Sequence, residues 1–264
     1  MPLDLFGRGK AFIGVIHLPP LPGSPRWGGD LGKVLDRARQ EADVLAQGGA
    51  HGIVVENYGD APFRIGRVES ETVSAMTLAV RAVQEVSSLP VGVNMLRNDA
   101  GSALAVAAVT GAGFIRVNVH YGVMAAYEGL VTGEAFETLR RRHALGVDVK
   151  ILADVLVKHA VPLGQTDLGL MAKETANRGL ADGLIVSGPA TGLPTSASDV
   201  AAARREVPSG FILVGSGITE ANVRDLLTIA DGAIVGTSLK KDGIITNPLD
   251  PLRVKAMAGI FMSF

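Results

Sequence analysis

The chain has 264 residues, a net charge of −1 and a hydrophobic content of 47%, enough to bury a full core. It contains no cysteine, which excludes a disulfide framework, a thiolate metal site and a cysteine nucleophile. The near-zero charge provides no basic field for nucleic acid, and no apolar run is long enough to span a membrane. The first residues lack the charged-then-apolar order of a signal peptide. We therefore expect a cytoplasmic protein without a transmembrane segment.

Short apolar runs that predict buried strands alternate with helix-period stretches along the whole chain. The expected strands are Ala11–Ile16, Gly52–Glu56, Val91–Met95, Phe114–Val119, Val149–Asp154, Gly183–Ser187, Phe211–Val214 and Ala233–Val235. The expected helices are Leu31–Gln47, Glu69–Val86, Ala100–Thr110, Glu134–Leu145, Leu168–Arg178, Ser198–Glu206, Glu220–Ala230 and Pro251–Phe261. This alternation predicts an α/β fold, a TIM (β/α)8 barrel, with residues 1–264 forming a single domain.

Small-residue turns follow the last two expected strands. They are Gly215-Ser216-Gly217, after which Thr219 can cap a helix, and Gly236-Thr237-Ser238. Glycine lets backbone N–H groups approach a ligand closely, and a helix N-terminus attracts anions. Barrels of this class build phosphate sites after strands seven and eight. We therefore expect both turns to bind a phosphorylated small molecule, unless they are merely tight turns. A third turn, which contains Gly188, Thr191 and Gly192, can reach the same anion.

Strand parity places several polar side chains on the inner face of the expected barrel, because the outer face packs on helices and must be apolar. The inward set is Glu56, Asn94, Arg116, Asn118, His120, Lys150 and Asp154, and His17 follows the first strand. Buried charges must be paired. We therefore expect Arg116 to bridge Glu56 or Asp154.

Glu56 and Asp154 are the acid/base candidates, with Asn94, Asn118 and His120 orienting the reacting group. In the alternative interpretation both carboxylates only neutralise Arg116 and Lys150, and His17 and His120 are structural. No cofactor is implied, although a carboxylate and a histidine can hold a divalent metal. A Schiff-base aldolase is disfavoured, because Gly183–Ser187 has no lysine and Lys150 lies far from the mouth.

Two loops are long enough to close over a ligand. They are Asn57–Arg64 and Val155–Gly164, and the second contains Lys158 and His159. The apolar C-terminal stretch, Met257–Phe264, is best explained as the last helix packing on the barrel or on a sister subunit in a homo-oligomer. It can also dock a partner or a membrane surface.

Three stretches together resemble the BtpA family over nearly the whole chain. They are GVIHLPPLPGSP from Gly14, GIVVENYGDAPF from Gly52, and GTSLKKDG from Gly236 ahead of Asn247-Pro248. The resemblance implies a TIM barrel. It also implies that cyanobacterial relatives take part in photosystem I biogenesis as extrinsic thylakoid-membrane proteins, while other relatives are described as sugar-phosphate or nucleoside-type enzymes.

Two functions remain open at this point. The first is an enzyme for a small phosphorylated metabolite that catalyses isomerisation, aldol-type cleavage or N-glycosidic cleavage. The second is a non-catalytic assembly or regulatory factor that is peripherally associated with a membrane. The fold alone does not decide between them.

Overall fold

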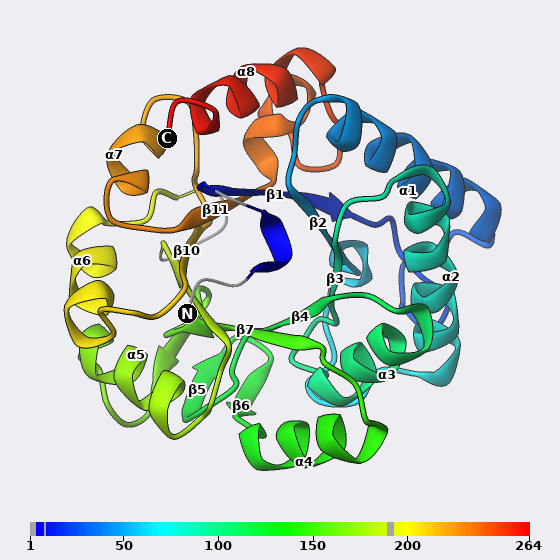
Figure 1. Ribbon diagram of the computed structural model, residues 1–264. Helices are drawn as coiled ribbons and strands as arrows, with labels where there is room; N and C mark the ends of the chain where they lie inside the picture. The colour runs from blue at the N-terminus through cyan, green and yellow to red at the C-terminus, as the bar shows by residue number, and fades with distance from the viewer. Residues whose placement is uncertain (1–3, 8, 189–192) are drawn as a thin grey trace.

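The computed structural model describes residues 4–7, 9–188 and 193–264. Eight parallel strands close into a barrel in the order β1-β11-β10-β9-β7-β4-β3-β2, inside a ring of helices (Figure 1). The barrel strands are β1 (Ala11–His17), β2 (Gly52–Glu56), β3 (Val91–Asn94), β4 (Phe114–Val117), β7 (Lys150–Val155), β9 (Gly183–Ser187), β10 (Ile212–Gly215) and β11 (Gly232–Val235). The predicted TIM barrel is confirmed.

A helix follows each barrel strand. The helices are α1 (Leu31–Gln47), α2 (Ser70–Val86), α3 (Ala100–Thr110), α4 (Ala135–Leu145), α5 (Leu168–Asn177), α6 (Ala197–Glu206), α7 (Val223–Leu227) and α8 (Pro251–Phe261). The main departure from the expected boundaries is α7, which is five residues long rather than spanning Glu220–Ala230. Thr219 does not cap it. Its backbone N–H instead bonds Asn222 Oδ1 at 2.9 Å, and the helix starts one residue after Asn222.

The amino end of the barrel is filled by aromatic side chains. Phe114 of β4 points into the barrel, and Gly92 of β3 leaves the space that its ring occupies. The first turn, η1 (Asp4–Phe6), lies across the barrel axis in Figure 1. Its Phe6 ring meets Phe114 edge-on at 5.4 Å and stacks on Phe211 at 6.1 Å. This end of the barrel is therefore closed by a packed apolar layer.

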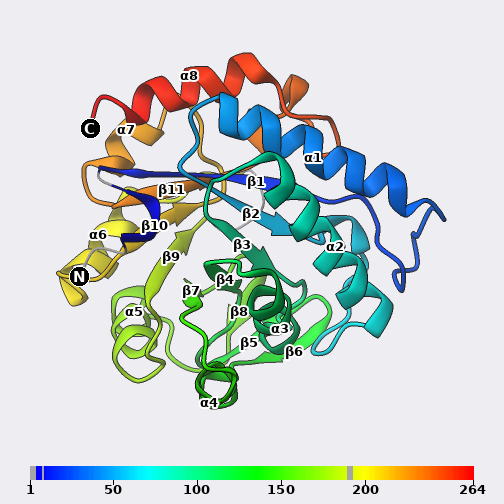
Figure 2. The same cartoon turned by 45° about the vertical axis from the view of Figure 1, so that its right-hand side comes forward.

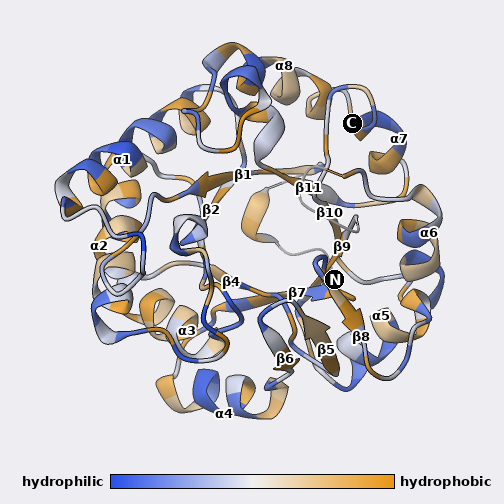
Figure 3. Ribbon diagram, turned by 180° about the vertical axis from the view of Figure 1, so that it is seen from behind, coloured by the Kyte–Doolittle hydropathy of each residue, from blue (hydrophilic) through white to orange (hydrophobic). Residues whose placement is uncertain are grey.

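A small antiparallel sheet, absent from the sequence-based prediction, stands beside the carboxyl end of the barrel. It has the order β6-β5-β8 and consists of β5 (Val123–Ala126), β6 (Gly129–Thr132) and β8 (Ala160–Pro162). Its strands come from the loops after β4 and β7, as the view from behind shows (Figure 3). Tyr127, Leu130 and Val161 around it are largely exposed. The loop Val155–Gly164 is therefore partly structured.

The C-terminal helix α8 packs on the barrel beside α1 (Figure 2). Phe261 stacks on Phe12 of β1 at 5.0 Å, and Met257 is buried. The large apolar side chains of the tail that are exposed are Met262 and Phe264. Within the described residues, no helix combines the length and apolar composition needed to cross a bilayer.

Two glycine-to-alanine changes should have opposite effects on stability. At Gly92 a Cβ would lie 2.1 Å from the enclosed Phe114 ring, so Gly92→Ala should lower the free energy of unfolding by about 1–3 kcal/mol. The control position is Gly259 of α8, where a Cβ meets nothing within 4 Å. Gly259→Ala should raise that free energy by about 0.5–1 kcal/mol. Denaturant titration of both variants checks this, and equal effects would contradict the described packing.

Candidate active site

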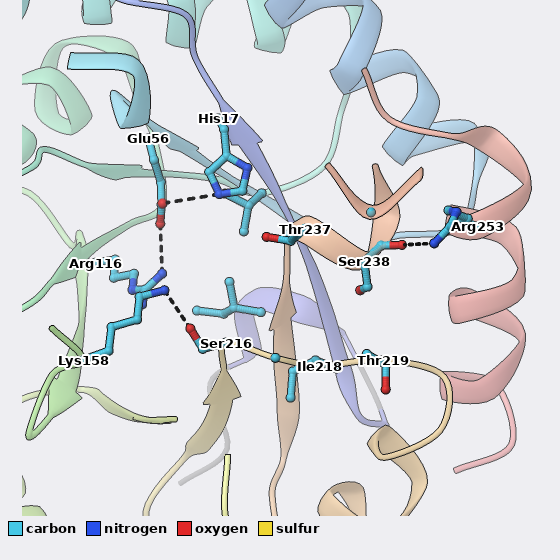
Figure 4. Close-up of a pocket in the computed structure, with 15 residues that line it drawn as sticks. His17, Glu56, Arg116, Lys158, Ser216, Ile218, Thr219, Thr237, Ser238 and Arg253 are labelled. Carbon is cyan, nitrogen blue, oxygen red and sulfur yellow. Dashed lines mark hydrogen bonds and ion pairs between the residues drawn. The ribbon is translucent and has the colours of Figure 1, made fainter. Parts of the chain in front are cut away.

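A cavity of about 280 Å³ opens at the carboxyl end of the barrel strands (Figure 4). Val15 of β1 and Ile234 of β11 form its apolar floor. Its polar lining comprises His17, Glu56, Arg116, Lys158, Ser216, Gly217, Thr219, Gly236, Thr237, Ser238, Gly243 and Arg253, with Ile218 beside them. Barrel enzymes place their active sites at this end. The cavity is therefore the candidate site.

Arg116 lies at the centre of a buried charge cluster. It donates two hydrogen bonds to Asp154, both of 3.0 Å, and a third of 2.9 Å to Glu56 Oε1. Asn94 donates to Glu56 Oε1 and Asn118 to Asp154 Oδ2, each at 2.9 Å. Arg116 thus bridges both expected carboxylates rather than one. The amides donate to the same carboxylates, so most polar atoms of the cluster are hydrogen-bonded, whereas Asn118 Oδ1 has no partner among the described residues.

The two carboxylates of the cluster differ in their access to the cavity. Asp154 has a fully buried side chain whose two oxygens are taken by Arg116 and Asn118, and it does not line the cavity. Glu56 lines the cavity, and both of its hydrogen bonds go to Oε1. Its Oε2 lies 4.0 Å from His17 Nε2. Of the two expected acid/base residues, Glu56 lines this cavity, whereas Asp154 borders a smaller one together with Asn118.

The charge cluster sets the protonation of Glu56 and Arg116. Burial opposes ionisation of Glu56, but the charge of Arg116 and the Asn94 hydrogen bond outweigh it and hold the pKa of Glu56 below its usual 4.5. Burial also opposes the charge on Arg116, yet Asp154 and Glu56 raise the pKa of Arg116 above its ordinary value. Glu56 is therefore a carboxylate at neutral pH, available to accept a proton.

His17, at the end of β1, is a neutral imidazole in the cavity wall. Burial lowers its pKa to about 3, despite the attraction of Glu56. Tyr58 packs edge-on against the ring at 4.9 Å. The ring also fills the space beside Gly236, where a Cβ would lie 2.7 Å from His17 Cε1. Its Nδ1 is buried and has no hydrogen-bond partner among the described residues, so it can bond a ligand.

The start of the loop after β2 is hydrogen-bonded to the loop after β1. Asp60, in the turn η2 (Tyr58–Asp60), accepts 2.7 Å and 2.8 Å hydrogen bonds from Leu21 N and Asn57 Nδ2. A Cβ on Gly59 would lie 2.4 Å from the backbone of Pro20, so only glycine fits there. These contacts join the loops after β1 and β2. They place Tyr58 beside His17, and closure of Asn57–Arg64 over a ligand stays a prediction.

Lys158 enters the cavity from the loop after β7. Its Nζ donates a 2.7 Å hydrogen bond to Ser216 Oγ (Figure 4). Burial, together with the charge of Arg116, lowers the pKa of Lys158 to about 8. The sequence placed Lys158 in a loop that can cover a ligand, but not among the site residues. Its position in a long βα loop was the sequence feature that could have indicated a place in the site.

Both expected phosphate turns border the cavity. Ser216 and Gly217 have positive φ angles of 68° and 60°. After Gly236 the chain forms a short turn, η3 (Thr237–Leu239), whose first internal hydrogen bond is donated by Leu239. The N–H groups of Thr237 and Ser238 therefore have no partner inside that turn. Ser238 Oγ is buried without a hydrogen-bond partner in the described structure.

Of the third turn, only Gly188 lies within the described residues. Gly188 borders a neighbouring cavity, which also contains Lys158, and Thr191 and Gly192 fall outside the described residues. Thr195, which the sequence did not single out, donates a 2.7 Å hydrogen bond to the carbonyl of Gly215. That bond joins the loop after β9 to the first phosphate turn. Gly215 itself ends β10 and does not line the cavity.

Two inward candidates that follow β4, which ends at Val117, do not line the cavity. His120 is buried elsewhere, with Nε2 2.8 Å from the carbonyl oxygen of Gly179. Asn118 contacts the site only through Asp154. Lys150 pairs with Asp148 at the start of β7, far from the mouth as expected.

A divalent metal finds no ready ligand set here. Among the described residues, no group of three or more His, Asp or Glu side chains is placed to share an ion. Glu56 and Asp154 already bind Arg116.

The fold and the cavity together define a (β/α)8-barrel protein with a polar site at the carboxyl end of its strands. Residues 8–262 match the BtpA family, and the chain belongs to that family. It is 53% identical over 244 residues to the photosystem I biogenesis protein BtpA of Synechocystis sp., covering 92% of this chain and 85% of the relative.

Two solved structures from Pyrococcus furiosus share the barrel fold. N-(5′-phosphoribosyl)anthranilate isomerase is 16% identical with a TM-score of 0.54, covering 96% of this chain and 100% of the other. Thiamine phosphate pyrophosphorylase is 14% identical with a TM-score of 0.58, covering 97% of each chain. At these identities the likeness shows the fold alone.

The charge of Glu56 should stabilise the fold in a pH-dependent way. Glu56→Gln should lower the free energy of unfolding by about 1.5–3 kcal/mol at neutral pH, because Arg116 loses a charged acceptor. Since the folded-state pKa of Glu56 lies below 4.5, its contribution is complete above that pH and is lost as the pH falls through the lowered pKa. Denaturant titration across that range should show the gap between the variant and the native protein closing.

A matched control is Glu220→Gln, at an exposed position. It should leave stability unchanged throughout. A gap for Glu56→Gln that widens in acid would contradict the assigned charge state.

Proposed function

We propose that this protein is an enzyme for a small phosphorylated metabolite, with the phosphate bound between Ser216–Gly217 and Gly236–Ser238. The observation that carries the proposal is the composition of one cavity. A buried hydroxyl without a partner, three cationic side chains, a carboxylate and a neutral histidine all line it. An anion binds at one side of such a cavity and a proton moves at the other.

The proposed phosphate site combines backbone and side-chain donors. Arg253 supplies positive charge, and the N–H groups of Thr237 and Ser238 lack partners inside their turn. Ser238 Oγ adds a hydroxyl. Hydrogen bonds that involve charged groups contribute about 1.5–3 kcal/mol each. The five-residue α7 contributes little, since it begins away from the first turn.

In this proposal Glu56 is the general base and His17 a neutral hydrogen-bonding partner of the substrate. Glu56 Oε2 accepts no hydrogen bond from the described residues and lies beside His17 at the cavity wall. Asp154 and Asn94 act as positioning residues, because Asp154 fixes Arg116 and both Arg116 and Asn94 fix Glu56 Oε1. General acid–base catalysis of this kind contributes about 10²–10⁴ in rate.

The proposed reaction is an isomerisation, an aldol-type cleavage or an N-glycosidic cleavage. The two barrels from Pyrococcus furiosus support a phosphorylated substrate, since their names specify a phosphoribosyl isomerase and a thiamine phosphate pyrophosphorylase. That support comes from fold analogy alone.

Charge at Ser216 should control anion binding. Ser216→Asp places a carboxylate beside Lys158, in a backbone conformation that aspartate and asparagine tolerate better than most residues. Calorimetry with inorganic phosphate should show at least about tenfold weaker binding, equivalent to 1.4 kcal/mol.

Ser216→Asn is the matched control, with the same shape and no charge. It should keep phosphate affinity close to that of the native protein. Equal phosphate affinity in the folded Asp and Asn variants would place the phosphate site elsewhere.

The relative from Synechocystis favours a second candidate function, a peripheral factor in membrane-protein assembly, because its name assigns it to photosystem I biogenesis. Exposed apolar side chains such as Tyr127, Met262 and Phe264 offer contacts to a partner, a sister subunit or a membrane surface. Co-sedimentation with membranes tests this candidate. A thermal-shift screen with phosphorylated metabolites tests the first, since a ligand that binds the folded state raises the melting temperature.

A further inference from the structure

We propose that Lys158 is a nucleophile that forms an imine with a carbonyl group, so that the substrate is a phosphorylated aldehyde or ketone. This inference rests on the proposed phosphate site and adds the chemical class of the other end of the substrate. No lysine lies on β9, and Lys150 lies at the far end of β7. The lysine at the mouth instead comes from the loop that follows β7.

The placement of the Lys158 amine supports this role. Lys158 Nζ lies at the cavity wall with Ser216 Oγ as its 2.7 Å hydrogen-bond partner. In the part of the chain that the structure describes, no carboxylate lies within 4 Å of it, in contrast to Lys240, which Glu41 holds at 2.7 Å. Lys240 is fixed as a buried cation. Lys158 has no such partner to hold its proton.

The protonation state of the Lys158 amine also supports this role. A pKa lowered from 10.5 to about 8 by burial and by Arg116 leaves more of the amine neutral. Near neutral pH the neutral fraction rises by about 300-fold over that of an ordinary lysine. Lysines become nucleophiles in this way, when they are desolvated or lie near another cation.

The backbone around Lys158 has an uncommon conformation. Leu156 and His159, on either side of Lys158, have positive φ angles of 48° and 59°. Such angles are uncommon outside glycine and gather at functional sites. Arg97 donates a 3.1 Å hydrogen bond to the carbonyl of Lys158 and pairs with Glu128 at 3.6 Å. The loop is thereby held with the Lys158 side chain in the cavity.

The proposed step is balanced without an oxidant or a cofactor. The neutral amine of Lys158 attacks the carbonyl carbon, and the oxygen takes up a proton to give a carbinolamine. The C–O bond then breaks, the oxygen leaves as water, and a protonated imine remains. One amine, one carbonyl group and one proton thus give one iminium and one water. The iminium acidifies the neighbouring C–H bond, whose proton the Glu56 carboxylate can accept.

Reductive trapping tests the inference directly. The full-length protein is treated with pyridoxal 5′-phosphate, a phosphorylated aldehyde, and then with borohydride, and the labelled lysines are mapped by peptide mass spectrometry. Lys158 should be labelled at least about tenfold faster than exposed Lys255, because more of its amine is neutral. Inorganic phosphate should slow labelling at Lys158 only. Pyridoxal, which lacks the phosphate, should label Lys158 much more slowly.

Lys158→Arg separates nucleophilicity from charge. It should lose the fast-labelled site, whereas the control Lys255→Arg should keep that site. If Lys158 reacts no faster than Lys255 although phosphate binds, the imine is ruled out and the phosphate site stands. If phosphate neither binds nor protects, the proposed function fails as well. Circular dichroism confirms that each variant is folded.

Discussion

The site depends on one interaction, the guanidinium of Arg116 held between Glu56 and Asp154 inside the barrel. Barrel interiors are normally filled with branched apolar side chains. Here a charged layer rests on an apolar one, so it persists only because its hydrogen bonds are nearly complete. Arg116 uses both oxygens of Asp154 and one of Glu56. Because Arg116 binds only one oxygen of Glu56, the other oxygen, Oε2, faces the cavity.

Much of this arrangement could be predicted from the sequence because strand periodicity is strict. Side chains alternate between the two faces of a strand, so apolar Ile115 and Val117 on the helix side fix Arg116 on the other. The same rule placed Glu56, Asn94 and Asp154 on the inner face. The glycine turns after β10 and β11 were visible because only small residues fit there. A Cβ on Gly217 would meet the Leu193 carbonyl oxygen at 2.2 Å.

The remaining features lie where periodicity ends. His120 follows Val117, the last residue of β4, so the alternation no longer determines its direction. The sheet β6-β5-β8 pairs segments from two different loops, a long-range contact without a local pattern. Lys158 lies next to that sheet, and tertiary contacts with Arg97 and Ser216 set its position. The position of a loop side chain such as Lys158 therefore cannot be predicted without the folded structure.

The aromatic plug at the amino end has a consequence for how the protein handles molecules. With Phe6, Phe114 and Phe211 packed together, the described residues close the amino end of the barrel. A molecule in the cavity therefore has no way out along the barrel axis and must leave on the carboxyl side, as must any water that it displaces. The amino end can then carry mutations that affect stability without changing how a molecule reaches the cavity.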